Sequence, residues 1–323
     1  MKAALLVGIN EYTNFHDKKL NGCVADVHKL QELLSYNADG TGNFDCKTIA
    51  ACPGGILDTR DQILREIRTL FSCNANTVLF YFSGHGIIDD DGGYLVTADA
   101  TSSNWGIPMS ELHSILEASP IKNKIVILDC CHAGILGDIK LAQGNHKAFI
   151  GAGTTIVASC RAEEFSRENG LAGGVFTSLL ADGLRGGAAD LMGHVTPGSL
   201  YSFVDSAFGP WEQRPIFKTN VSEFVSLRKA VPPIKLDCLR KLNVFFECPT
   251  SEYQLSPEFE YTSPQHDDMK VSIFKDLQAM ERVGLVVPVN EEHMYYAAMN
   301  SSTCRLTSLG EHYWDLVNKG RLK

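Results

Sequence analysis

Two short stretches of this 323-residue chain end in side chains that could do nucleophilic chemistry. Residues 124–134 read KIVILDCCHAG, where an apolar run gives way to Asp129 and two adjacent cysteines. Residues 77–86 read TVLFYFSGHG, a second apolar run that is followed by a histidine between glycines. A cysteine attacks an amide carbonyl as its thiolate, so it needs a nearby base or cation. The question is therefore whether the thiol of Cys131 and the imidazole of His85 meet.

Both stretches predict a buried parallel strand that carries its reactive group at the C-terminal end. Unbroken apolar runs are typical of strands covered on both faces, and open α/β sheets bind ligands beyond the carboxyl ends of their strands. If the strands are neighbours, about 5 Å apart, His85 and Cys131 can face one substrate carbonyl. Gly86 has no Cβ, which lets backbone N–H groups approach an oxyanion. We expect the N–H groups of Gly86 and Cys131 to form that oxyanion hole.

Spacing alone leaves a structural interpretation open for this pair. A single histidine or cysteine at a strand end is more often structural than catalytic. Here each of the two, His85 and Cys131, follows a buried run and lies near glycines. That coincidence favours a site.

The remaining patterns of the first 228 residues alternate between strand and helix. This alternation predicts a mostly parallel sheet covered by helices on both faces. Strands are expected at 3–9, 47–52, 77–82, 94–97, 124–129 and 154–159, and helices at 20–36, about 59–71, 111–118, 174–184 and 200–208.

A Pro-Pro step at residues 232–233 marks a change to a second region. A helix is expected at 271–283, a hairpin of two strands at 284–289 and 294–298, and a terminal helix at 306–317. This outline predicts a small α+β domain of winged-helix type over 261–323, joined to the first by a connecting segment at 229–260. From residue 229 onward there are 11 basic and 13 acidic residues. DNA binders usually carry a basic face, so contact with a regulatory protein partner is expected instead.

Composition narrows the classes of partner. The net charge of −9 argues against general attraction to nucleic acid or to an anionic membrane. The apolar runs are far shorter than a membrane span, and the start of the chain leads directly into an expected strand rather than a signal peptide. The ten cysteines contain no C-x-x-C pair, so we expect reduced thiols in a cytoplasmic protein and no zinc site.

The two motifs resemble the active-site motifs of the caspase-like cysteine peptidases, specifically the metacaspase branch. His85 and Cys131 are 46 residues apart, and about 50 separate the corresponding residues of caspases. Asp129 takes the position at which caspases carry Gln, and Asp at this position is typical of metacaspases. The resemblance spans about residues 1–228 and implies a caspase-like, mostly parallel six-stranded sheet with helices on both faces. It also includes LLVGIN at 5–10, NGCVADV at 21–27, GVFTSLLADGL at 174–184 and QRPIF at 213–217.

The resemblance implies roles for five residues. Cys131 would be the nucleophile and His85 the general base and acid. Cys130 takes the place where the family usually has Ser, and we interpret it as a packed small residue. Asp26 and Asp129 would line the primary specificity pocket, where two carboxylates favour a cation and suit Arg better than Lys. Cleavage after Arg or Lys is therefore predicted, although by position alone Asp26 could simply complement its helix dipole.

Two other sets of residues have both a functional and a structural interpretation. Asp89, Asp90 and Asp91 could bind calcium, which some metacaspases need, but a solvated turn before two glycines is the favoured interpretation because no EF-hand spacing is present. Lys140 and Lys147 lie in the polar segment after Cys131, where many caspase-like enzymes are cut. If the enzyme cleaves after basic residues, either lysine is a candidate self-processing site.

The main functional hypothesis is a cysteine endopeptidase that acts on proteins without a cofactor. Regulation through residues 229–323 is expected, and bacterial relatives of this kind often serve in cell death or defence against phage. The rival hypothesis is a catalytically silent caspase-like scaffold, which the presence of both His85 and Cys131 argues against. A third, a DNA-binding regulator, would require salt-sensitive binding to duplex DNA.

Overall fold

The computed structural model describes residues 1–51, 59–136, 138–140, 146–148, 150–159, 174–208, 214–221 and 223–322. The chain divides into two compact units, which are described separately. The first unit comprises residues 1–189 and 194–231, and the second comprises residues 190–193 and 232–323.

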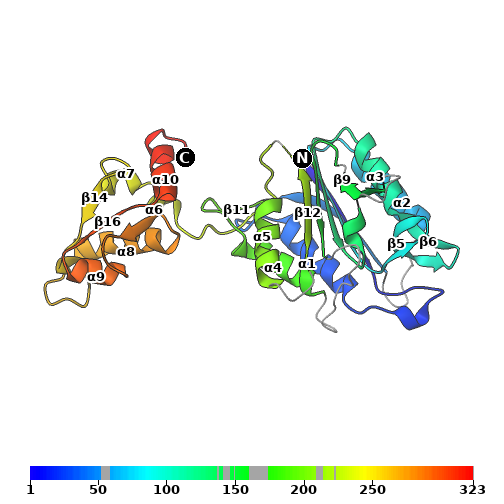
Figure 1. Cartoon of the computed structure of the whole chain (residues 1–323), viewed down its shortest axis with the longest axis horizontal. Helices are drawn as coiled ribbons and strands as arrows, with labels where there is room; N and C mark the ends of the chain where they lie inside the picture. The colour runs from blue at the N-terminus through cyan, green and yellow to red at the C-terminus, as the bar shows by residue number, and fades with distance from the viewer. Residues whose placement is uncertain are drawn as a thin grey trace. The chain divides into compact units, whose positions relative to one another are not determined.

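A six-stranded sheet forms the centre of the first unit (Figure 1). Its strand order is β12-β10-β7-β3-β1-β2, with β12 antiparallel to β10 and the other neighbours parallel. This confirms the mostly parallel sheet that the unbroken apolar runs predict. The strands are β1 (Lys2–Ile9), β2 (Phe44–Ala51), β3 (Thr77–Ser83), β7 (Asn123–Asp129), β10 (Thr154–Ala158) and β12 (Ile216–Asn220).

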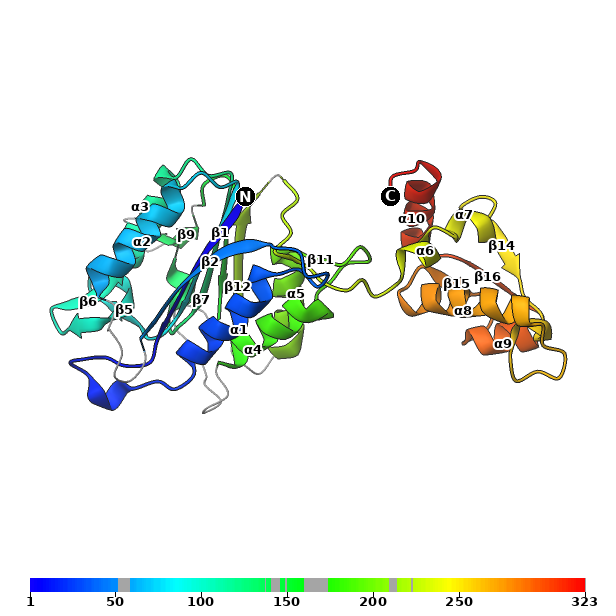
Figure 2. The same ribbon diagram turned by 180° about the vertical axis from the view of Figure 1, so that it is seen from behind.

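Helices cover both faces of this sheet, as Figures 1 and 2 show from opposite sides. Alternate residues of β3 separate the two cores: Leu79 and Tyr81 pack with one set of helices, and Phe80 and Phe82 pack with the other. The first set is α1 (Cys23–Ser35), α4 (Val175–Asp182) and α5 (Pro197–Phe208), and the second is α2 (Arg60–Ser72) and α3 (Met109–Ala118).

Shorter elements decorate this framework. A three-stranded antiparallel sheet of β4 (Gly86–Asp89), β5 (Gly92–Thr101) and β6 (Asn104–Pro108) connects β3 to α3. The sequence patterns predicted only part of β5. The other elements are the helical turns η1 (His16–Lys18), η2 (Ala133–Ile135) and η4 (Gly183–Gly187), and the short strands β8 (Asp138–Lys140), β9 (His146–Ala148), β11 (His194–Val195) and β13 (Arg228–Lys229).

The second unit packs helices around a small antiparallel sheet of order β14-β16-β15. Its strands are β14 (Glu252–Gln254), β15 (Val286–Pro288) and β16 (Thr303–Leu306). The helices are α6 (Leu236–Leu239), α7 (Leu242–Phe245), η5 (Pro257–Phe259), α8 (Asp268–Arg282), α9 (Met294–Met299) and α10 (Ser308–Asn318).

The predicted second strand of the hairpin, at residues 294–298, is wrong, because this segment is helix α9. Met294, Ala297 and Ala298 are its buried residues. Their spacing of three and four places them on one face of a helix. The strand that pairs with β15 begins nine residues later, at Thr303. The predicted helix–hairpin–helix outline therefore differs from the structure between its two strands, where a helix is inserted. The winged-helix assignment stays a prediction.

No helix in the part of the chain that the structure describes combines the length and apolar character needed to cross a membrane.

Candidate active site at the carboxyl ends of β3 and β7

The sheet register brings the histidine and cysteine segments to the same level. Ser83 and Asp129 are paired across β3 and β7, so His85 and Cys131 each stand two residues beyond one shared position. The N–H of Gly84 donates to the carbonyl oxygen of Asp129 at 3.3 Å, and this bond holds the C-terminal ends of β3 and β7 together. The two segments thus leave neighbouring strands side by side.

Gly86 lies directly against the backbone of Cys131. A Cβ atom at position 86 would collide with the Cys131 carbonyl oxygen and lie 3.2 Å from Sγ of Cys130. Any side chain there would force the β3 and β7 ends apart. Glycine at position 86 is therefore needed for the close packing of these two segments, and the oxyanion hole of Gly86 and Cys131 stays a prediction.

The loop after β1 orients the imidazole of His85. Its Nε2 atom lies 2.7 Å from the carbonyl oxygen of Lys18. A carbonyl only accepts hydrogen bonds, so Nε2 carries the proton, and Nδ1 of the neutral ring is left able to accept one. The backbone N–H of His85 also donates to the Tyr12 hydroxyl at 2.8 Å. This arrangement resembles a base held by a third group, the general pattern of activated nucleophile sites.

Sequence reasoning did not identify Tyr12 or Lys18. Lys18 contributes only its backbone carbonyl, which every residue type has, so no residue pattern could have revealed it. The one available signal was an aromatic residue, Tyr12, three residues after the end of the first strand.

The chain turns sharply at the cysteines, and the turn separates the two thiols. Cys130 is 1% exposed and packs in the core beneath α2 and α3, whereas Cys131 is half-buried. His132 then adopts a left-handed conformation, with φ of 60°, which costs an ordinary residue about 1–2 kcal/mol. The turn is held from β12, because Nζ of Lys218 donates to the carbonyl oxygens of Gly134 at 2.7 Å and Leu136 at 3.0 Å.

Asp26 and Asp129 converge on the start of α4. The N–H of Gly174 donates to Oδ2 of Asp26 at 2.9 Å, and the hydroxyl of Thr177 donates to Oδ2 of Asp129 at 2.7 Å. A Cβ atom on Gly174 would lie 2.5 Å from Oδ2 of Asp129 and 3.4 Å from Oδ2 of Asp26. The two carboxylates therefore share one buried location on the α1–α4 side of the sheet. They are 1% and 6% exposed.

Burial and mutual repulsion both disfavour the ionised form of Asp26 in this pair. The pKa of Asp26 is raised to about 7, mainly by burial and also by the nearby negative charge of Asp129, while the N–H of Gly174 and the ammonium of Lys29 act to lower it. Lys29 lies 3.5 Å from Oδ1 of Asp26. That oxygen is buried and has no hydrogen-bond partner among the described residues. Beyond the ion pair with Lys29, this oxygen can therefore still accept a hydrogen bond.

The raised pKa of Asp26 predicts a pH-dependent stability. The folded chain holds this proton up to about pH 7, while the unfolded chain loses it near pH 4. Folding therefore takes up a proton between these values, and stability falls as the pH rises through them. An Asn side chain does not titrate, so the free energy of unfolding of Asp26→Asn, relative to that of the wild type, should rise by about 2–3 kcal/mol from pH 5 to pH 8. Urea unfolding of both chains at the two pH values measures this, and a constant difference would contradict it.

The other candidate residues lie elsewhere. Oδ1 of Asp89 accepts from the N–H groups of Asp91 at 2.9 Å and Gly92 at 3.2 Å, so Asp89–Asp91 form the turn between β4 and β5. Within the described ranges, no three His, Cys, Asp or Glu residues are placed to hold a metal ion. Lys140 in β8 and Lys147 in β9 belong to one antiparallel pair of strands, and their side chains lie outside the described part.

Comparisons with known proteins agree with this architecture. The model of the caspase domain family (Peptidase C14) matches residues 1–227. The structure is similar to that of caspase-1 from Spodoptera frugiperda, with a TM-score of 0.51 and 17% sequence identity. That match covers 71% of this chain and 90% of the insect chain, and it establishes a shared fold. No curated protein matches by sequence.

Proposed function

Since the chain belongs to the caspase domain family of cysteine peptidases, we propose that it is an endopeptidase of the metacaspase type that cleaves proteins after Arg or Lys. The observation that carries the specificity is the buried pair Asp26 and Asp129, which adjoins the strand ends of His85 and Cys131. A carboxylate oxygen in this pair lacks a hydrogen bond among the described residues. The catalytic roles are supported by the register of β3 and β7.

In this proposal His85 moves one proton through two steps. Nδ1 takes the proton of the Cys131 thiol as sulfur attacks the carbonyl carbon of the substrate. The N–H groups of Gly86 and Cys131 stabilise the oxyanion. As the C–N bond breaks, His85 returns the proton to the departing amine, and an acyl-thioester remains. Water, deprotonated by His85, then hydrolyses the thioester and restores the thiol.

The carboxylate pair supplies the specificity. A guanidinium can bridge two carboxylates through several N–H groups at once, while an ammonium acts as a point charge. Arg should therefore be preferred over Lys. Asp129 is two residues before Cys131, so the substrate side chain held by the pair belongs to the residue whose carbonyl is attacked.

Regulation by a protein partner is part of the same proposal. It is supported by large apolar side chains that the second unit exposes, among them Val244, Tyr261 and Met269 at 70–76%. The weakly acidic composition of residues 229–323 favours protein over nucleic acid as the partner. A role in bacterial defence or cell death rests on the resemblance alone.

A panel of fluorogenic peptides that differ only at the residue before the cut tests the proposal. We expect cleavage of the Arg peptide at least about 100-fold faster than of Asp or Leu peptides, with Lys second. The Cys131→Ala chain is the control and should cleave none of them. Cleavage after Asp, or cleavage after Arg that survives in the control chain, would contradict the proposed function.

A further inference from the structure

A cavity of about 310 Å³ borders His85 on the other side of the sheet from the acidic pair. Tyr12, Phe15, Ile87 and Trp105 line it together with the imidazole. This volume lies within the range of small-ligand pockets. Lys18 and His132 also border it, but most of the wall is aromatic and aliphatic, in contrast to the two carboxylates beneath α1 and α4.

The strand ends that carry His85 and Cys131 separate this cavity from the buried pair Asp26 and Asp129. Asp129 hydrogen-bonds to Thr177 of α4, on the α1–α4 face. Tyr12 belongs to the core on the α2–α3 face, against which Phe15 and Ile87 also pack. A peptide that crosses the carboxyl edge of the sheet, with one side chain held by the acidic pair as proposed above, thus reaches the aromatic cavity with a neighbouring residue.

The role of His85 in the reaction indicates which side of the cleaved bond occupies this cavity. His85 gives its proton to the amine that leaves, so its ring must face the amino-terminal end of the departing fragment. A cavity that the same ring lines lies on that side of the cut. We propose that this cavity is the subsite for the residue immediately after the cleaved bond, and that it selects a large apolar or aromatic side chain. The inference rests on the proposed peptidase function.

Two rings of the cavity offer a stacking surface. The rings of Phe15 and Trp105 are stacked, with centroids 5.6 Å apart and an interplanar angle of 22°. Both residues are half-buried, so part of their area remains for a substrate side chain. An aromatic substrate residue would extend the stack and bury apolar area, which a glycine or a carboxylate cannot do.

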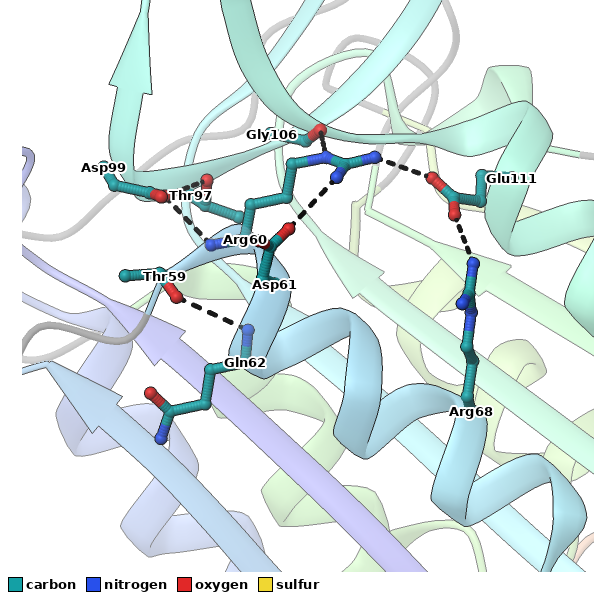
Figure 3. Close-up of polar contacts among 9 residues, drawn as sticks. All are labelled: Thr59, Arg60, Asp61, Gln62, Arg68, Thr97, Asp99, Gly106 and Glu111. Carbon is teal, nitrogen blue, oxygen red and sulfur yellow. Dashed lines mark hydrogen bonds and ion pairs between the residues drawn. The ribbon is translucent and has the colours of Figure 1, made fainter.

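Trp105 belongs to β6, and a polar network around Arg60 holds the β5–β6 hairpin in place. Figure 3 shows this network. The Arg60 side chain donates from Nε to the carbonyl oxygen of Gly106 at 2.8 Å and from Nη2 to Glu111 at 2.9 Å. The backbone N–H of Arg60 donates to Asp99 at 3.0 Å, tying the end of β5 to the start of α2. Gly106 has φ of +132°, and a Cβ there would collide with β5. The hairpin is therefore set before a substrate arrives, as selectivity requires.

This subsite can be tested with a set of peptides that contain the cleaved bond and differ only in the residue after it. Each has Arg before the cut and Phe, Leu, Gly or Asp after it. Binding to the full-length Cys131→Ala chain is measured by fluorescence anisotropy, and cleavage by the wild type is measured in parallel. We expect the Phe and Leu peptides to bind and react about 10-fold better than the Gly peptide.

Trp105→Ala should bring the ratio of Phe to Gly peptide, in both binding and cleavage, close to one. Trp105→Phe should restore part of the preference. The matched control is Phe224→Ala, because Phe224 lines a cavity of about 330 Å³ beside Asn123 and Gly153, at the amino ends of β7 and β10. This variant should keep the full preference.

Equal binding of the Phe and Gly peptides, or a preference that survives Trp105→Ala, would overturn the subsite alone. Cleavage of none of these peptides by the wild type would instead contradict the proposed function. The binding measurements on the Cys131→Ala chain decide the subsite in either case.

Discussion

Replacement of Cys131 by Ala is expected to lower kcat/KM for an arginyl peptide by at least about 10⁴-fold, because no other group forms the acyl bond. Cys130→Ala is the matched control, since it removes the neighbouring sulfur. Cys130 is buried in the core beneath α2 and α3 and cannot reach a substrate without refolding of the turn. The Cys130→Ala variant should therefore keep its activity within about tenfold of the wild type. Any loss would come from the small cavity that Ala leaves in the core.

Kinetics and thermal unfolding of the two variants, measured together, separate the roles of the thiols. Both variants should unfold within a few degrees of the wild type, so a folding defect cannot explain the difference. If Cys130→Ala loses activity while Cys131→Ala keeps it, the assignment of the nucleophile is wrong. If both keep it, the peptidase mechanism based on this site is wrong.

Asp26→Asn is expected to lower kcat/KM for an arginyl peptide by about 100-fold, mainly through KM, because it removes one charge of a buried cation site. Asn keeps an oxygen that can accept from the N–H of Gly174, so the start of α4 is preserved. Asp129→Asn should behave similarly. For a Leu peptide the same changes should have little effect or a small favourable one.

The ratio of Arg to Leu cleavage is the decisive readout for these carboxylates. Asp90→Asn is the control, since it makes the same chemical change in the exposed turn between β4 and β5. It should leave the ratio unchanged. Equal losses for Arg and Leu peptides in Asp26→Asn would show that the pair maintains structure rather than selecting the substrate.

The central sheet was predictable because its strands are buried on both faces. The apolar runs at 78–82 and 125–128 leave no polar face, which favours parallel strands covered by helices. The C-terminal ends of two such neighbouring strands then lie close together. Segments of mixed pattern were harder. β6 contains Gly106 and ends in Pro108, residues that usually argue against a strand, yet it pairs with β5.

Contacts between distant loops explain what the sequence left out of the site. The resemblance to the family places Asp26 beside Asp129, but the residue pattern alone cannot, because their closeness depends on how α1 and α4 pack. The carbonyl of Lys18 reaches His85 because the loop after β1 folds back over the sheet edge. In the second unit, residues 294–299 show how a short apolar segment fits both a strand and a helix until its neighbours are known.

The most direct measurement is the site at which an arginyl acyloxymethyl ketone modifies the chain. Such a compound places Arg in the specificity pocket and alkylates the attacking sulfur. Peptide mapping by mass spectrometry should find one adduct, on Cys131, which Asp26→Asn slows and a leucyl ketone does not form at the same concentration. An adduct on Cys130 or another cysteine, or equal labelling by the two ketones, would contradict the account.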